Sequence, residues 1–294
     1  MDTARYRAFL NAADTGSIKN AGEIMGYTSS GVSQLIRSLE EELNLTLLFR
    51  GKKGVSLTSA GEEMLPAIRR LVSQENTLFQ LAADLNGTVA GTINIAAYRS
   101  LQGAWMPDII ASFQQEYPKV RINLYEGTQR EIQERLISGK ADMAFFNNSM
   151  MTGGYDWIPL MDDPMVAVLP ENHPLAEAEV FKIESFEGER FIMPEHGFDY
   201  DVVELLGQHG VVPDVYLSTF DSTILLEMVG RGLGVSIING SCMTGWDNKY
   251  GLKAIPLEPY ESLHMGIAVL SLKESAPAVK KFAEYAEKHV IEQL

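Results

Sequence analysis

The chain has 294 residues, 46% of them hydrophobic and 21% charged, and a formal net charge of −15 at pH 7. This composition excludes a disordered or fibrous protein, and the length is typical of about two globular domains. The apolar runs, such as MVAVL and MGIAVL, are far too short to cross a bilayer, and the first residues lack the apolar segment of a signal peptide. We therefore expect a cytoplasmic protein with no membrane partner.

The charge is unevenly distributed along the chain. Residues 1–60 contain seven Lys and Arg against six Asp and Glu, a balance of +1, which leaves −16 for residues 61–294. Binding to the phosphate backbone needs local positive charge, so the overall acidity does not exclude a nucleic-acid partner for the first part. We expect the two parts to have different partners.

Three short helices are predicted before residue 45. Gly16 ends the first, Ser17 can cap a second helix over 18–25, and Gly26 closes it. Thr28 can then cap a third helix over 29–43. Two short helices joined by a turn that contains Gly are the pattern of a helix-turn-helix.

The third helix has two chemically different faces. An apolar stripe with helical spacing contains Val32, Leu35, Ile36, Leu39 and Leu43. The opposite face carries Ser30, Ser33, Gln34 and Arg37, with Ser29 at the first position. Such a face could read DNA or could simply be solvated, and the helix alone leaves both interpretations open.

A hairpin and a long helix follow. Two β-prone stretches flank Gly51-Lys52-Lys53-Gly54, which predicts a hairpin whose basic tip could contact a phosphate or remain solvated. Thr58 can cap a helix that continues to residue 85, about 42 Å long, with an apolar stripe that needs a partner. Asn86-Gly87 ends this helix, and residues 87–91 are expected to form a hinge.

From residue 92 the chain alternates between strands and helices, as in a parallel α/β sheet. TINIAA, RINLYE and DMAFF are predicted strands, separated by the helical stretches WMPDIIASFQQEYP and QREIQERLIS. A second set begins at PMVAVLP, and the chain closes with LKAIPLE, MGIAVLS and a helix from about residue 277. Two α/β lobes joined by crossing strands would leave a cleft between the strand ends.

The sequence resembles the LysR-type transcriptional regulators over nearly its whole length. The resemblance rests on GSIKNAGEIMGYTSSGVSQLIRSLEEEL, LTSAG, FQQEYPKVRINLYEG, GKADMAFF and LLEMVGRGLGVSII, which occur in the family's order. Ser29 stands where the family commonly has Gln, Gly31 replaces a common Ala, and Leu48 occupies a usual Phe position. These departures bear on the DNA sequence preference and leave the expected fold unchanged.

The resemblance implies an N-terminal all-α winged helix-turn-helix, a long linker helix and a two-lobed α/β effector domain like a periplasmic solute-binding protein. We expect a DNA-binding domain over 1–58, a dimerising helix over 59–86, a hinge over 87–91 and an effector-binding domain over 92–294. Lobe I would contain about 92–163 and 265–294, and lobe II about 164–264. The expected function is a small-molecule-responsive transcriptional regulator that acts as a homodimer or homotetramer.

The expected partners are double-stranded DNA and a small effector. The residues predicted to contact DNA bases or phosphates are Ser29, Ser30, Ser33, Gln34, Arg37, Arg50, Lys52 and Lys53. Carboxyl ends of several strands should converge on the cleft, and the family's effector contacts correspond to the loop near Ser100 and to Thr128. The full set of predicted effector residues is Tyr98, Arg99, Ser100, Thr128, Asn147, Met193, Pro194, His196 and Phe198.

The chemical class of the effector is open at this point. Arg99 favours an organic acid, which is the first candidate, whereas Glu195, Asp199 and Asp201 on the facing loop favour a neutral or amine-bearing molecule. Thr128 could also serve only as the cap of the following helix, and the two roles are compatible.

Enzymatic signals are weak. The single cysteine, Cys242, excludes an internal disulfide and a cysteine-based zinc cluster. The five histidines show no paired metal-ligand spacing, no G-x-S-x-G occurs, and GRGLGV at 230–235 runs from helix to strand, the reverse of a dinucleotide fingerprint. We expect no enzyme, no cofactor and no metal. The alternative function is a solute-binding or sensing module without a DNA role, for which the first 60 residues would have no use.

Overall fold

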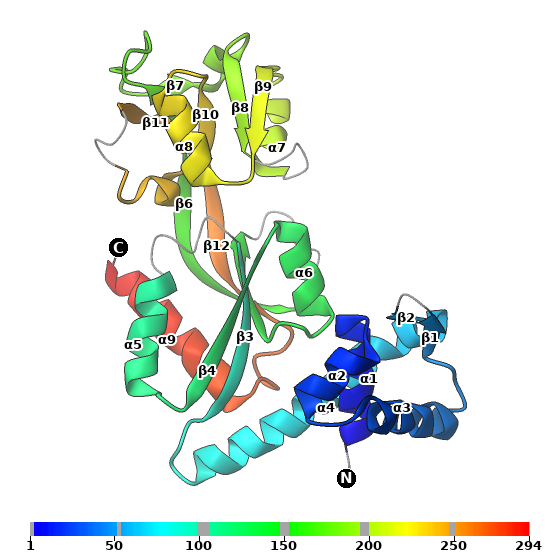
Figure 1. Ribbon diagram of the computed structural model, residues 1–294. Coiled ribbons are helices and arrows are strands. Elements are labelled where there is room, and N and C mark those ends of the chain that lie inside the picture. The colour runs from blue at the N-terminus through cyan, green and yellow to red at the C-terminus, as the bar shows by residue number, and fades with distance from the viewer. Residues whose placement is uncertain are drawn as a thin grey trace.

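The computed structural model describes residues 3–51, 54–98, 106–147, 153–194, 200–246 and 251–293. A helical head at the N-terminus is followed by one long helix, which leads into two α/β lobes joined by a pair of long strands (Figure 1).

The head consists of three helices and a two-stranded hairpin. These elements are α1 (Ala4–Thr15), α2 (Ile18–Met25), α3 (Ser29–Leu43), β1 (Leu48–Gly51) and β2 (Gly54–Leu57). The predicted caps are present, because Ser17 accepts a hydrogen bond from the Asn20 backbone N–H and Thr28 accepts one from that of Gly31. Val32, Ile36 and Leu39 of α3 are fully buried against α1, so the apolar stripe holds the third helix in place.

The long helix α4 (Ser59–Leu85) begins at Thr58, whose side chain accepts from the Gly61 backbone N–H, as predicted. Its first half packs on the head through Ile68 and Val72. Its second half lies against the α/β part, where the Gln80 side chain accepts from the backbone N–H of Ala278. This approach requires glycine at residue 91, because φ is +139° and a Cβ would lie 2.5 Å from the Gln80 side chain.

The first lobe is a parallel sheet with helices on both faces. Its elements are β3 (Gly91–Tyr98), α5 (Met106–Glu116), β4 (Val120–Gly127), α6 (Gln129–Ile137), β5 (Met143–Asn147) and the final helix α9 (Pro277–Gln293). Phe113 of α5 and Phe282 of α9 pack together on one face, while Ile132 and Leu136 of α6 pack on the other. Figure 1 shows α6 between the sheet and the head.

Two long antiparallel strands connect the lobes. They are β6 (Asp156–Pro170) and β12 (Ser262–Val269). In the second lobe the end of β6 pairs with β10 (Ser236–Asn239) and β11 (Leu252–Glu258), and β11 also pairs with β7 (Phe181–Lys182). The order β4-β3-β5-β12-β6-β11-β7 therefore contains parallel and antiparallel pairs: β3 is parallel to β4 and β5, as predicted for the first lobe, and β6 and β12 form the crossing strands.

The remainder of the second lobe surrounds a parallel strand pair. It contains β8 (Arg190–Pro194), α7 (Tyr200–Gln208), β9 (Asp214–Thr219), α8 (Ser222–Gly230) and the short 3-10 turns η2 (Ile183–Phe186) and η3 (Gly240–Met243). Asn147 at the end of β5 in the first lobe donates a hydrogen bond to Asp201 at the start of α7 in the second, so polar side chains from both lobes meet between them.

Candidate functional site

The outward face of α3 is polar and uncovered. Ser29, Ser30, Gln34 and Arg37 are exposed, and Ser33 is half-buried. The Ser30 hydroxyl lies 3.0 Å from that of Thr28, so it is already oriented by the helix cap. Hydroxyl, amide and guanidinium groups on one helix face can hydrogen-bond base edges and phosphates in a major groove.

The hairpin beside α3 also carries an arginine, but this side chain is partly neutralised. The Arg50 guanidinium lies 3.6 Å from Oε2 of Glu40, whose other oxygen accepts hydrogen bonds from the backbone N–H groups of Leu47 and Leu48. Glu40 therefore fixes the start of the hairpin and offsets one positive charge. Lys52 and Lys53, the predicted phosphate contacts at the tip, lie outside the described residues.

A polar cluster joins the two lobes at the predicted cleft. Asn147 ends β5, is 1% exposed, and donates a hydrogen bond of 2.9 Å to Oδ2 of Asp201 at the start of α7. The Asn147 amide also pairs reciprocally with that of Gln129, at 3.3 and 3.5 Å. The sequence predicts Asn147 as an effector residue and places the negative charge of Asp201 on the loop across the cleft. Nothing in the sequence predicts a role for Gln129 apart from its position after Thr128.

Thr128 forms a capping box with Glu131. Its hydroxyl accepts from the Glu131 backbone N–H, and the Glu131 carboxylate accepts from both the backbone N–H and the hydroxyl of Thr128. The prediction that Thr128 caps this helix is confirmed. One acceptor site of the hydroxyl is left for a ligand, so both predicted roles fit the geometry.

The other predicted effector residues are placed less completely. Met193, at 7% exposure, packs in the lobe core, and the half-buried Pro194 ends β8. The backbone of Tyr98 ends β3, but its side chain is not described. Four predicted residues fall outside the described parts of the chain: Arg99, Ser100, His196 and Phe198.

Two carboxylates mark the crossing between the lobes, and the sequence reasoning missed both. Asp163 on β6 is 1% exposed and accepts hydrogen bonds from the backbone N–H and the hydroxyl of Ser241. The neighbouring Asp162 is exposed and lies 2.5 Å from Nδ1 of His264 on the partner strand β12. These contacts link the crossing strands with each other and with η3.

An ionic contact joins the head, the long helix and the effector domain. Asp14 of α1 accepts two hydrogen bonds, of 2.8 and 2.9 Å, from the buried Arg69 of α4, and Lys140 after α6 lies 3.1 Å from Asp14. Burial alone would raise the pKa of Asp14, but the hydrogen bonds and charges of Arg69 and Lys140 outweigh it, and the pKa is lowered. These residues are 55 and more positions apart in sequence, so no local pattern pointed to this contact.

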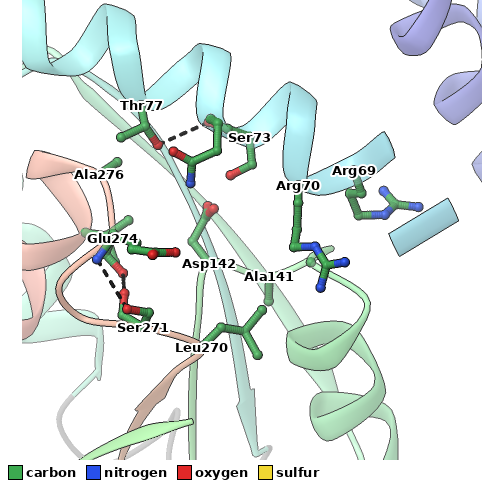
Figure 2. Close-up of a pocket in the computed structure, with 14 residues that line it drawn as sticks. Arg69, Arg70, Ser73, Thr77, Ala141, Asp142, Leu270, Ser271, Glu274 and Ala276 are labelled. Atoms are coloured by element: carbon green, nitrogen blue, oxygen red, sulfur yellow. Dashed lines mark hydrogen bonds between the residues drawn. The ribbon is translucent and has the colours of Figure 1, made fainter. Parts of the chain in front are cut away.

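A cavity of about 120 Å³ lies next to this contact, between α4 and the effector domain. Figure 2 shows Asp142 and Glu274 facing the side of α4 that carries Arg70, Ser73 and Thr77. Burial raises the pKa of Asp142, although the backbone and side-chain N–H groups of Asn94 donate to its Oδ2 and oppose the shift. Asp142 therefore holds the turn before β5 on β3 at an electrostatic cost.

Two negative findings apply to the described ranges only. They contain no group of three or more His, Cys, Asp and Glu side chains that could hold a metal ion. Within the same ranges, no helix is both long and apolar enough to cross a membrane.

Comparison with known proteins identifies both halves of the chain. Residues 3–62 match the model of the bacterial regulatory helix-turn-helix protein of the lysR family, and residues 86–290 match that of the LysR substrate binding domain. The uncharacterized HTH-type transcriptional regulator YvbU of Bacillus subtilis is 29% identical over 288 residues, which cover 98% of each chain. The transcriptional dual regulator GltC of the same organism is 26% identical over 293 residues, covering 97% of this chain and 96% of GltC.

Solved structures agree on the fold. The full-length OxyR C199D protein of Pseudomonas aeruginosa superposes with a TM-score of 0.81 at 18% sequence identity, covering 99% of this chain and 94% of that protein. HinK, a LysR family transcriptional regulator of the same organism, superposes with a TM-score of 0.61 at 23% identity, covering 98% of each chain. At these identities the likeness concerns the fold alone.

Proposed function

The chain belongs to the LysR family of DNA-binding transcriptional regulators, and from this premise we propose which of its surfaces read DNA, pair subunits and sense the effector. The observation that carries the proposal is the polar, uncovered face of α3 on a head that shares one chain with a two-lobed ligand-binding domain. A solute-binding module without a DNA role would leave this head unused. We propose that the protein works in the cytoplasm and catalyses no reaction.

The DNA-reading residues are Ser29, Ser30, Ser33, Gln34 and Arg37. The exposure of Ser29, Ser30, Gln34 and Arg37 supports this assignment, and the half-buried Ser33 is the least accessible of the five to a DNA base or phosphate. Arg50, Lys52 and Lys53 would contact phosphates. The ion pair of Arg50 with Glu40 makes its contribution the weaker, because the carboxylate competes with the phosphate for the guanidinium.

The proposed dimer contact lies on α4, which falls within the proposed dimerising helix of residues 59–86 and follows the proposed DNA-binding domain of residues 1–58. Leu71, Leu78 and Leu85 follow each other at intervals of seven residues and are 36%, 64% and 88% exposed. Leu81, at 45%, lies on the same side of the stripe. Aliphatic side chains at heptad spacing that are unburied within one chain are suited to a paired helix, as in a coiled coil.

The effector would bind between the lobes of the 92–294 domain, near Thr128 and the Asn147–Asp201 contact. A small organic acid stays the first candidate because Arg99 adjoins Ser100 in the sequence. The carboxylate of Asp201 at this cleft would repel an effector that carries only negative charge, but it would accept a hydrogen bond from a donor group on the effector. We therefore propose an organic acid that also carries a hydroxyl or amino group.

A thermal-shift screen tests this assignment. Purified protein is heated with a panel of simple organic acids, each paired with its hydroxy and amino derivatives, and a ligand that binds the folded state raises Tm. For a compound that raises Tm, Ser100→Ala and Thr128→Val should abolish the shift. Thr128→Ser, which keeps the capping hydroxyl, should preserve it.

Two outcomes of this screen would overturn different parts of the proposal, namely the position of the effector site and the role of Asp201. Binding of a panel member with wild-type affinity to both Ser100→Ala and Thr128→Val would show that the effector site is elsewhere. A preference for plain acids over their hydroxy and amino derivatives would contradict the role given to Asp201.

A further inference from the structure

We infer that α6 is the element that couples the effector cleft to the DNA-binding head, with the Lys140–Asp14 ion pair as its output contact. The inference rests on the proposed function, because it assigns the route by which the cleft regulates DNA binding. It starts from one observation: the first residue of this short helix is hydrogen-bonded through Asn147 to the second lobe, and the turn that follows its last residue contacts the head.

The first end of α6 lies in the polar cluster between the lobes. Gln129, the first residue of the helix, is 7% exposed and pairs with the amide of Asn147, which donates in turn to Asp201 of α7. Asp201 belongs to the second lobe and Gln129 to the first. A ligand that changes the separation of the lobes must therefore stretch, break or replace the Asn147–Asp201 hydrogen bond. The amide pair of Asn147 and Gln129 then has to adjust, because these nearly buried amides cannot exchange their hydrogen bonds freely for water.

The other end of α6 reaches the head. Backbone hydrogen bonds from Lys140 and Ala141 to the carbonyl of Arg135 tie the following turn to the last turn of the helix. Gly139, at φ +69°, lies against the side chain of Arg69, and Lys140 reaches Asp14 of α1. In Figure 1 the lower end of α6 adjoins the head and its upper end points to the second lobe.

Between these ends the helix is built as a stiff unit. The capping box fixes its N-terminus, and Arg130 pairs with Glu134 one turn later at 3.0 Å. Nine residues span about 13 Å, so a displacement of the first turn is carried to the last without internal bending.

The surface on which α6 packs permits a small displacement of the whole helix. Its two buried aliphatic side chains, Ile132 and Leu136, belong to one cluster with Phe146 and four alanines, Ala96, Ala141, Ala144 and Ala268, against which Tyr155 and Trp157 also pack. Alanine side chains form a shallow floor without deep interlocking, which favours small sliding shifts of a packed helix. The head responds as one body, because α1 packs on α3 and Arg69 fixes Asp14 to α4.

A double-mutant cycle read by hydrogen exchange tests the coupling without DNA or effector. Asp201→Ala cuts the cleft end, and Lys140→Met cuts the head end while leaving the Asp14–Arg69 pair intact. Lys182→Met, an exposed lysine of the second lobe, is the matched control. We expect Asp201→Ala to change amide exchange in residues 4–15 by about 2- to 30-fold in the wild-type and Lys182→Met backgrounds, and to leave it unchanged in the Lys140→Met background.

A second cleft variant guards against an unrelated effect of Asp201→Ala. Gln129→Leu cuts the same chain of hydrogen bonds on the α6 side, so it should change exchange in residues 4–15 in the same direction, and the two variants together should do no more than either alone. Far-UV circular dichroism verifies that each variant is folded. Unchanged exchange in the head of both single variants, or an equal change with and without Lys140, would overturn the inference.

The affinity for a duplex that the wild-type protein selects from a random library then connects this coupling with function. The effect of Asp201→Ala on this affinity should be several-fold and should disappear in the Lys140→Met background. If no duplex is selected at all, the proposed function fails while the exchange result still decides whether α6 transmits the change. If DNA binds but the head does not respond to the cleft variants, the function stands and the inference about α6 falls.

Discussion

Asp14→Asn should destabilise the head by about 2 kcal/mol at pH 7. In the wild-type protein two charged hydrogen bonds, of 2.8 and 2.9 Å, join Asp14 to Arg69, and Arg69 is only 9% exposed. An amide has a single acceptor oxygen, so one of these bonds is lost and part of a buried guanidinium is left unpaired. A hydrogen bond to a charged group contributes about 1.5–3 kcal/mol, and solvent near the 34% exposed Asp14 side chain moves the value toward the lower half.

The effect should depend on pH in a defined direction. Because the pKa of Asp14 is lowered in the folded protein, its stabilisation is complete above the unfolded value near 4 and is lost as pH falls through the folded pKa. The stability difference between the wild-type and the Asp14→Asn protein should therefore shrink on acidification. An effect that was constant or grew from pH 7 to pH 3 would be inconsistent with an ionised Asp14.

Hydrogen exchange in residues 4–15, with urea unfolding followed by circular dichroism, measures this difference. All three tryptophans lie after residue 100, so their fluorescence would not report on the head. Glu23→Gln, an exposed carboxylate in α2 with a long 3.8 Å ion pair, is the control and should change stability little. A loss below about 0.5 kcal/mol for Asp14→Asn at pH 7 would refute the reasoning.

Other predictions follow from the same contacts. Asp142→Asn should stabilise the protein at pH 7 and have no effect below about pH 4, because the raised pKa of Asp142 makes its ionised form destabilising as pH rises. Thermal unfolding across this pH range measures the gain in stability, and a gain that shrank as pH rose would contradict the dominance of burial. Leu71→Glu and Leu78→Glu should produce monomers in light scattering, since each buries a carboxylate in the proposed helix pair, whereas Ile137→Glu, at the exposed last residue of α6, should not. Dimers in both leucine variants would exclude α4 as the interface.

Local sequence signals predicted the local structure well. Thr28, Thr58 and Thr128 each cap a helix as predicted, because a threonine hydroxyl before a periodic apolar run satisfies a free backbone N–H by itself. Helical spacing of apolar residues predicts the buried stripe of α3, and two β-prone stretches around a Gly-Lys-Lys-Gly turn predict the hairpin. The first half of β6 was missed, since Pro159 and Pro164 disrupt a strand pattern that only its long-range pairing with β12 makes favourable.

The polar contacts between separate parts of the chain were beyond sequence reasoning. Asp14, Arg69 and Lys140 lie on three elements, and each alone is an ordinary charged residue in a helix or turn. Gln129 and Asp201 meet through Asn147 only because two lobes close on one another. Spacing predicts which face a side chain occupies, but it contains no information about which distant face will be opposite.

Binding of the wild-type and Arg37→Ala proteins to one selected duplex, at one fixed salt concentration, tests the central claim most directly. The account predicts that Arg37→Ala loses about 1–3 kcal/mol of affinity for this duplex and discriminates less against mismatched duplexes, while dimerisation and folding are unchanged. Lys182→Ala, at an exposed lysine of β7 in the second lobe, should bind like the wild-type protein. Equal affinity and equal discrimination in the Arg37→Ala and wild-type proteins would contradict the assignment of α3 as the DNA-reading helix.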